Sequence, residues 1–326
     1  MEIRRTVQFT GGSSFSITLP KEWATRMGIR RGSTVVLKTL EDGSVVVYPE
    51  KERTYEDHEV EIPLGPHVSQ MILGAYLYGY NTIRIKSATS MDDTELANVK
   101  KAVRGLAGAE IVDETPTKVE IQVVLDRELV APEKLLRRQH TLVLGMVENS
   151  VDAYVRKNNS LAKLVVQRDE EVDRLYFTLV RTIRSAIVDP TLAKRLEASP
   201  LLLMDLRVAA KFIEDAGDQS AEIAKEALKN VREIDEDLGK DLKYFAQLIT
   251  SMGTGPVDAF FSQDMEKITK ITSVRTDFQR RGDAFLKKAL QTQALTTMFK
   301  VYSHLARICE DLADTAELGL PFKPPS

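Results

Sequence analysis

The stretch TGGSSFSITLPKEW, Thr10–Trp23, sets two glycines and two serines before an alternating apolar run and Pro-Lys-Glu. Such a string can be a phosphate-gripping loop, a passive linker or a turn that aims two strands. The flanking residues favour the turn, because residues 3–9 and 15–19 have strand patterns and Pro20 suits the start of a helix. No Gly-Lys-Ser/Thr follows, which disfavours the phosphate loop.

The next thirty or so residues extend this pattern to a small β-rich module. Gly28 is expected to end the helix, and residues 34–40 and 45–48 are expected to form a hairpin around Asp42-Gly43. A module of about fifty residues with one short helix has little interior of its own. Dimerisation is the natural way to cover its apolar faces.

GGSSFSITLPKEWATRMGIRRGSTVVL, residues 11–37, resembles the N-terminal domain of the AbrB/SpoVT type. The resemblance covers residues 1–50 and gives a predicted domain at 1–52. It implies that two chains interleave their hairpins into one small swapped-hairpin barrel, which makes the protein a homodimer. In that family the domain commonly binds DNA, and dimerisation without DNA is the alternative.

The charge distribution agrees with a polyanion partner for this module. Seven basic and two acidic residues lie within the first forty, although the whole chain has a formal net charge of -3. The alternative is that these lysines and arginines form an ordinary solvated surface with no bound partner. The residues predicted to contact DNA phosphates are Arg4, Arg5, Lys21, Arg26, Arg30 and Arg31. None of them is assigned to base reading.

Residues 54–128 predict a small α+β connector. Strand patterns lie at residues 60–62, 82–86, 109–112 and 119–125, with helical patterns at 68–78 and 92–106. The sequence shows no catalytic constellation here. A structural spacer is favoured over an effector site, and both stay open.

From residue 132 to 320 the pattern is helical. Helices are predicted at 133–157, 160–187, 200–229, 232–251, 257–290 and 292–318, which suggests one or two bundles. Asp169 and Asp173 lie four apart on one helix. A Glu-Asp-x-x-Asp motif that begins at Glu214 recurs at Glu310.

Three stretches resemble the PhoU family: RDEEVDRLYFTLVRTI (168–183), FIEDAGDQSAEIA (212–224) and ICEDLADTAEL (308–318). The resemblance implies two three-helix repeats and a multinuclear metal site. Its ligands would be Asp169, Asp173, Glu214 and Asp218, with Glu310 and Asp314 in the second repeat. Opposite the last two, Asp277 has Arg281 four residues on, which puts a complete second cluster in doubt. The metal would be iron, zinc, manganese or magnesium, and helix-surface solubilisation is the alternative role of these acids.

The two resemblances together predict a cytoplasmic, phosphate-responsive regulator, most simply a transcriptional one that controls phosphate uptake as a DNA-binding dimer. The alternative is an adaptor that docks its helices on a phosphate transporter or sensor kinase. A carboxylate-bridged metal enzyme is disfavoured, because no histidine has a glutamate three residues before it. The lone Cys309 fits a reducing cytosol, no membrane insertion is expected, and the domain combination suggests an archaeal source.

Overall fold

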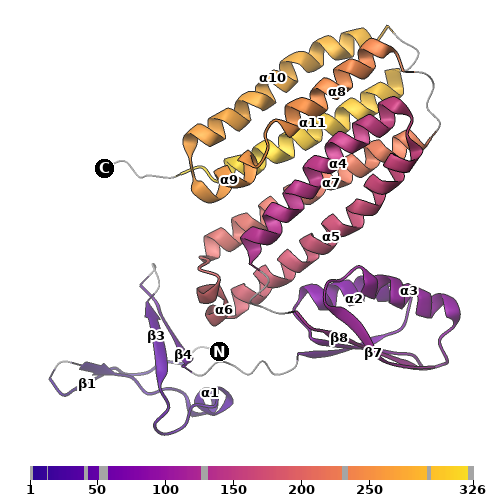
Figure 1. The fold of residues 1–326 in the computed structure, drawn as a ribbon. Helices are drawn as coiled ribbons and strands as arrows, with labels where there is room; N and C mark the ends of the chain where they lie inside the picture. The colour runs from indigo at the N-terminus through magenta and orange to yellow at the C-terminus, as the bar shows by residue number, and fades with distance from the viewer. Residues whose placement is uncertain are drawn as a thin grey trace. The chain divides into compact units, whose positions relative to one another are not determined.

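The computed structural model describes residues 3–12, 14–39, 43–50, 58–125, 131–229, 234–291 and 295–321. The chain divides into two compact units, Met1–Glu56 and Asp57–Ser326 (Figure 1). The first holds short hairpins, and the second holds an α/β layer followed by long helices, which confirms the predicted multidomain fold class. The predicted boundary between residues 128 and 132 stays a prediction, because both sides of it lie in the second unit.

The glycines of the first stretch form a hairpin turn. β1 (Gln8–Thr10) pairs antiparallel with β2 (Ser14–Ser16), and Gly11 and Gly12 between them both have positive φ. Glycine adopts this backbone conformation without a Cβ clash, so two adjacent glycines suit the turn. The strands are shorter than predicted, because residues 3–7 and 17–19 have no ladder partner within the described part of one chain.

The rest of the first unit follows the predicted order. Helix α1 spans Lys21–Arg26. Pro20 is its N-cap and not its first residue, so the helix begins one residue later than predicted. Gly28 follows the end of the helix with a φ of +68°. β3 (Val35–Thr39) pairs antiparallel with β4 (Val45–Pro49). The predicted turn at Asp42-Gly43 includes a residue that lies outside the described ranges.

No described side chain of the first unit is buried. Phe9, Phe15 and Leu37 are 63%, 76% and 65% exposed. A folded unit of this size needs apolar burial to offset the conformational entropy that folding costs. The described residues of one chain therefore leave a large apolar surface to be covered by another surface.

The α/β layer at the start of the second unit is a mixed sheet with two helices. β5 (Glu59–Pro63) and β6 (Thr82–Lys86) are parallel and are joined by helix α2 (Val68–Leu77), because parallel neighbours need a crossover connection. β7 (Ala109–Thr115) and β8 (Lys118–Val123) complete the strand order β5-β6-β8-β7. Helix α3 (Asp93–Arg104) starts at a capping box between Asp92 and Glu95.

Both edges of this sheet have features that oppose the addition of another strand. β5 ends at Pro63, which has no N–H to donate, and β7 has a bulge at Val112 that interrupts its ladder. On one face, Arg84 forms ion pairs with Glu59 and Glu120. The buried apolar side chains of the sheet pack against those of α2 and α3.

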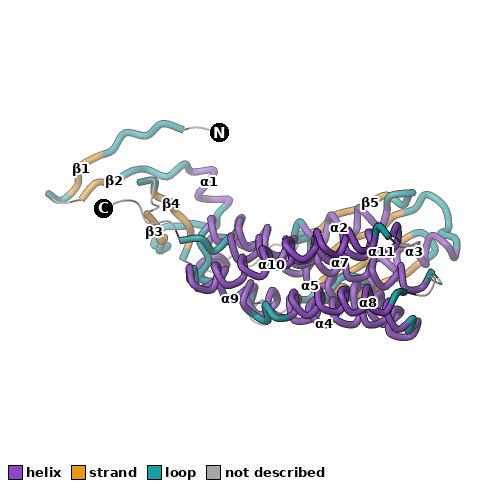
Figure 2. Tube along the Cα trace, turned by 90° about the horizontal axis from the view of Figure 1, so that it is seen from above, coloured by secondary structure: helices purple, strands orange, loops and turns teal. Residues whose placement is uncertain are grey.

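The long helices form two bundles that share an interface. α4 (Pro132–Arg156), α5 (Asn159–Val188) and α7 (Pro200–Leu228) pack on one another. α8 (Glu236–Thr250), α10 (Met265–Ala289) and α11 (Leu295–Glu317) pack with the short α9 (Gly255–Ser262), and α7 lies against α11. Figure 2 shows these long helices aligned along a common direction.

One predicted helix is divided in two. Residues 257–290 were expected to be continuous, but α9 ends at Gln263, which has a φ of +52°, and Asp264 caps α10 by accepting from the backbone N–H groups of Glu266 and Lys267. An aspartate at an N-cap is a strong start signal, so the sequence did contain the break. A short helix, α6 (Pro190–Arg195), also precedes α7. None of the described helices has both the length and the apolar character of a membrane span.

Arg181 of α5 joins the α/β layer to the bundle. Its buried guanidinium donates to the carbonyl oxygens of Tyr76 (2.6 Å), Tyr80 (3.0 Å) and Gly79 (3.3 Å), and to Asn81 Oδ1 (2.7 Å). It also lies over the Tyr76 ring at 4.9 Å. A cation at the end of α2 satisfies carbonyls that the helix leaves unpaired and interacts favourably with the helix dipole.

We predict that Arg181→Ala lowers the free energy of unfolding by about 3 kcal/mol, because each buried carbonyl that loses its partner costs roughly 1–3 kcal/mol. The matched control is Arg138→Ala, which removes a 65% exposed arginine paired with Glu171 and should cost less than about 1 kcal/mol. Urea unfolding followed by circular dichroism measures both. Equal effects of the two variants would contradict this role of Arg181.

Candidate functional site

Acidic side chains from α5 and α7 come together where these two helices pack. α5 carries Asp169 and Asp173, and α7 carries Glu214 and Asp218. Gly217 lies at the contact, and a Cβ atom there would be 3.1 Å from Val172 Cγ1 and 3.7 Å from Asp169 Oδ1. The absence of a side chain at Gly217 thus allows the close approach of the two acidic faces.

Three of the carboxylates are close enough to share one cation. One oxygen each of Glu214, Asp215 and Asp218 lies within 4.8 Å of the others. Asp215 was not among the predicted ligands. The sequence did contain an indication of Asp215 as a ligand, because it lies three residues before Asp218 and therefore at a neighbouring position on the helix surface.

The electrostatics show that these acids are crowded. Burial, with Asp173 and Asp218 adding to it, raises the pKa of Asp169 to about 7. Burial and then Asp218 raise the pKa of Asp173 to about 6, and burial raises that of Glu214 to about 7 in spite of its contact with Lys211. Burial also raises the pKa of Asp218. Each acid is thus easier to protonate than usual, because burial disfavours its charged form and neighbouring carboxylates add to this effect.

The available counter-charges do not reach all members of this cluster. Lys211 contacts Glu214 and lies 2.8 Å from Asp215 Oδ1. In the described ranges no lysine, arginine or histidine lies within ion-pair distance of Asp169, Asp173 or Asp218, and the buried Asp169 Oδ1 has no hydrogen-bond partner. An oxygen-rich set with an unpartnered buried oxygen fits a hard cation such as magnesium, manganese or ferric iron.

The second repeat surrounds Glu310 and Asp314 differently, and their role as metal ligands stays a prediction. Arg275 of α10 lies 3.6 Å from Glu310, 3.3 Å from Asp314 and 2.5 Å from Glu317. Asp277 instead pairs with Arg280 and Arg281 on its own helix. The guanidinium of Arg275 therefore already supplies positive charge to Glu310 and Asp314, so we expect them to hold a metal less strongly than the acids of the first repeat.

Asp311 is a buried acid that sequence reasoning missed. It is fully buried, its carboxylate lies 2.9 Å from Arg307 Nη2, and burial raises its pKa to about 7 in spite of Arg307. Asp215 raises that pKa further, since α7 and α11 pack together. The two residues hold equivalent positions in the repeated motif, which was the available signal.

The six basic residues predicted to contact DNA are all exposed in the first unit. Arg4 and Arg5 precede β1, Lys21 and Arg26 lie on α1, and the remaining two follow Gly28. Exposure leaves them accessible to a polyanion.

Family models match both parts of the chain. Residues 8–55 match "Antidote-toxin recognition MazE, bacterial antitoxin", and residues 136–227 match the PhoU domain. The PhoU match spans the first three-helix repeat, and both matches confirm the resemblances drawn from the sequence, since the MazE domain is of the AbrB-like type. The chain thus carries a MazE/AbrB-like N-terminal domain and a PhoU domain.

Solved structures extend the likeness in fold. The phosphate transport system regulatory protein PhoU from Streptococcus pneumoniae is 19% identical, with a TM-score of 0.50 over 59% of this chain and 93% of its own. PhoU from Pseudomonas aeruginosa is 18% identical, with a TM-score of 0.51 over 59% of this chain and 95% of its own. No curated protein matches the chain in sequence.

The acids of α5 and α7 predict a pH dependence for protein stripped of metal by a chelator. Their folded-state pKa values of about 7 for Asp169 and Glu214 exceed the usual values of 3.8 and 4.5. Between pH 4 and pH 7 the folded state therefore binds more protons than the unfolded state, so the free energy of unfolding should fall as the pH rises through this range. The expected fall is about 2 kcal/mol once solvent screening of part-exposed groups is allowed for.

Burial lowers the pKa of His140 to about 4, so this residue changes the free energy of unfolding with pH in the opposite direction. A double variant therefore separates the effect of the two acids from that of His140. Thermal unfolding at several pH values should compare the natural chain with the variant Asp169→Asn, Glu214→Gln. The difference between them should shrink as the pH falls to 4. A difference that is independent of pH would show that the carboxylates do not repel one another.

Proposed function

We propose that this chain is a regulator of phosphate uptake rather than an enzyme. The observation that carries the proposal is the carboxylate cluster of Glu214, Asp215 and Asp218 on α7, with Asp169 and Asp173 of α5 in electrostatic contact with Asp218, all within the segment that matches the PhoU domain. The Streptococcus pneumoniae structure with the same fold is titled a phosphate transport system regulatory protein. The described residues contain no group of side chains that we can assign to nucleophilic catalysis. A cytoplasmic location is part of the proposal.

The metal centre of this proposal uses Asp169, Asp173, Glu214 and Asp218, with Asp215 added from the structure. A bound cation would neutralise the carboxylates and hold α5 against α7. The chain's own contribution is to bring the acids together at Gly217 and to leave Asp169 Oδ1 without another partner. Oxygen ligands favour magnesium, manganese or ferric iron over zinc.

Asp218→Asn should lower the metal content of the purified protein and lower the thermal midpoint measured with metal, because less cation then binds the folded state. In the chelated protein the same change should raise the thermal midpoint, since one repelling charge is removed. Asp314→Asn is the matched control at the equivalent position of the second repeat. It should leave the metal content unchanged, because Arg275 already pairs with Asp314.

Elemental analysis and differential scanning calorimetry measure these effects. A natural chain that binds no cation, and whose thermal midpoint does not respond to added divalent or ferric ions, would remove the metal centre from the proposal. In that case the acids would have only a surface role.

We further propose that the first unit forms a homodimer by exchanging hairpins and that the dimer binds DNA. The exposed apolar side chains of β1 to β4 support an intermolecular core, since the described residues of one chain bury none of them. The match to the MazE model agrees with this arrangement. The predicted phosphate contacts are the six basic residues from Arg4 to Arg31. A transcriptional regulator would then couple the PhoU-type bundle to operator binding.

The alternative is an adaptor that dimerises through the first unit but does not bind DNA. Its helical bundle would contact a phosphate transporter or a sensor kinase. No feature of the described residues favours this alternative over DNA binding, and DNA affinity measured across a range of salt concentrations separates the two.

The variant Arg4→Ala, Arg5→Ala should weaken binding to DNA from upstream of phosphate-transporter genes, and to unrelated DNA, by similar factors. The slope of log K against log salt should flatten by about one unit for each DNA phosphate that the variant no longer neutralises. The control is Arg138→Ala, Arg280→Ala, which removes two exposed arginines from the second unit. Fluorescence anisotropy across a salt series measures the slope. A dimer that binds no DNA would favour the adaptor.

A further inference from the structure

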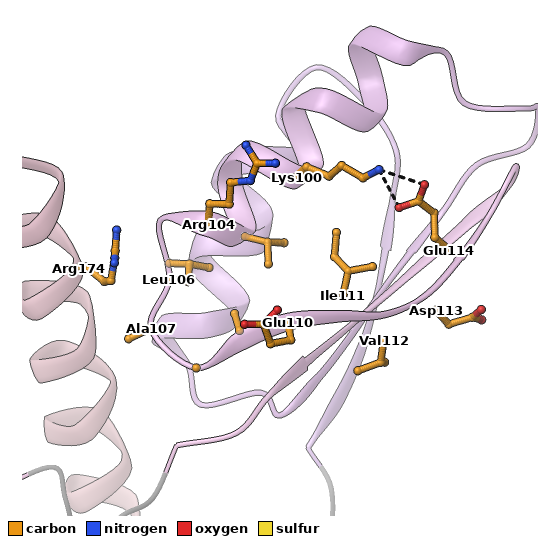
Figure 3. A pocket seen from close by; sticks show the side chains of 13 residues that line it. Lys100, Arg104, Leu106, Ala107, Glu110, Ile111, Val112, Asp113, Glu114 and Arg174 are labelled. Atoms are coloured by element: carbon orange, nitrogen blue, oxygen red, sulfur yellow. Dashed lines mark hydrogen bonds and ion pairs between the residues drawn. The ribbon is translucent and has the colours of Figure 1, made fainter. Parts of the chain in front are cut away.

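A groove lies where the α/β layer meets α5. It has a volume of about 710 Å³, and α3, the turn after α3, β7 and Arg174 of α5 line it. Figure 3 shows Arg174 on α5 across from the end of α3 that carries Arg104, with Leu106 between the two in this view. A volume of this size suits a small organic ligand.

Two guanidinium groups in the groove lack a carboxylate partner. Lys100 is paired with Glu114 at 3.0 Å, but among the described residues neither Arg104 nor Arg174 has an acidic group within ion-pair distance. Other arginines of this unit do, such as Arg84 and Arg275. The groove thus has two cationic forks, from different elements, that are free to bind an anion.

Buried contacts fix the distance between the two walls of the groove. The Tyr76 hydroxyl donates to the carbonyl oxygen of Ala107, which lines the groove, at 3.1 Å, and lies 3.4 Å from Thr178 Oγ1 on α5. Thr178 is one helical turn from Arg174, and Arg181 binds the end of α2 one turn further on. The backbone elements from which the exposed side chains of Arg104 and Arg174 extend are therefore held by buried contacts, which lowers the entropic cost of binding.

We propose that this groove binds a small phosphorylated compound through its phosphoryl group. A phosphoryl group carries up to two charges and three acceptor oxygens, which suffices for two arginine forks, whereas a carboxylate has two oxygens and one charge. Leu106 and Ile111 provide an apolar floor. Glu110 also lines the groove without an ion pair in the described ranges and can accept from a hydroxyl group of the ligand. A sugar phosphate carries both kinds of group.

The position of the groove gives this ligand a route to the helical bundle. Arg174 directly follows Asp173, which belongs to the acid cluster on α5. A ligand that holds Arg174 would also restrain this turn of α5. The proposed ligand site does not rest on the proposed regulatory function, since its residues contribute to neither the acid cluster nor the first unit.

Isothermal titration calorimetry on the full chain tests the proposal with ribose 5-phosphate, ribose and inorganic phosphate as probes. Ribose 5-phosphate should bind with a Kd below about 1 mM, and ribose should not bind measurably. Arg104→Gln and Arg174→Gln should each weaken binding at least tenfold. Lys101→Gln, an equal charge change on an exposed residue of α3 that does not line the groove, should weaken it less than twofold.

Inorganic phosphate distinguishes the source of the phosphoryl group. Equal affinity for inorganic phosphate and ribose 5-phosphate, abolished in both arginine variants, would support the phosphoryl site and assign it to the free ion. No binding of either probe, or binding that survives both arginine substitutions in folded protein, would overturn the proposal. Circular dichroism spectra of the variants establish that they fold.

Discussion

The close packing of α5 against α7 at Gly217 is the constraint on which the second unit depends. It brings Asp169 and Asp173 beside Glu214 and Asp218, and burial then raises the pKa of each. Like charges in a part-buried site oppose the packing that creates them. The helices can stay together because apolar burial over their whole length outweighs this repulsion, and protonation or a cation can relieve it.

The two repeats meet the same electrostatic problem in different ways. In the second repeat Arg275 reaches Glu310, Asp314 and Glu317, so a covalently attached cation is always present. In the first repeat Lys211 pairs only with Glu214 and Asp215. The first repeat therefore leaves Asp169, Asp173 and Asp218 to be neutralised by protons or bound ions. In the second repeat Arg275 supplies a built-in counter-charge, although burial still raises the pKa of Asp311 to about 7.

The α/β layer is joined to the first repeat of the bundle through α5. Arg181 and Thr178 contact the α/β layer, and Asp173 lies about two turns before Arg181 on the same helix. A change at the acid cluster can thus reach the α/β layer along one rigid helix. The first unit has no comparable internal core, because none of its described side chains is buried. Its stability has to come from contacts outside the described part of one chain.

The sequence by itself determined the elements and the families. Gly-Gly at residues 11–12 predicted a turn because glycine accepts positive φ, and the long helical periodicity predicted the bundles. It also predicted the four acids of the first repeat, since a repeated spacing is visible in one dimension. The sequence was less decisive where a capping signal competed with apolar periodicity. At Asp264 the capping role divides a helix that the periodicity alone makes continuous. Only the tertiary structure decided which acids have a counter-charge, because Arg275 reaches Asp314 from another helix. It alone revealed Asp311 as buried and placed Arg104 and Arg174 in the lining of one groove, since contacts between residues distant in the chain depend on packing and not on spacing.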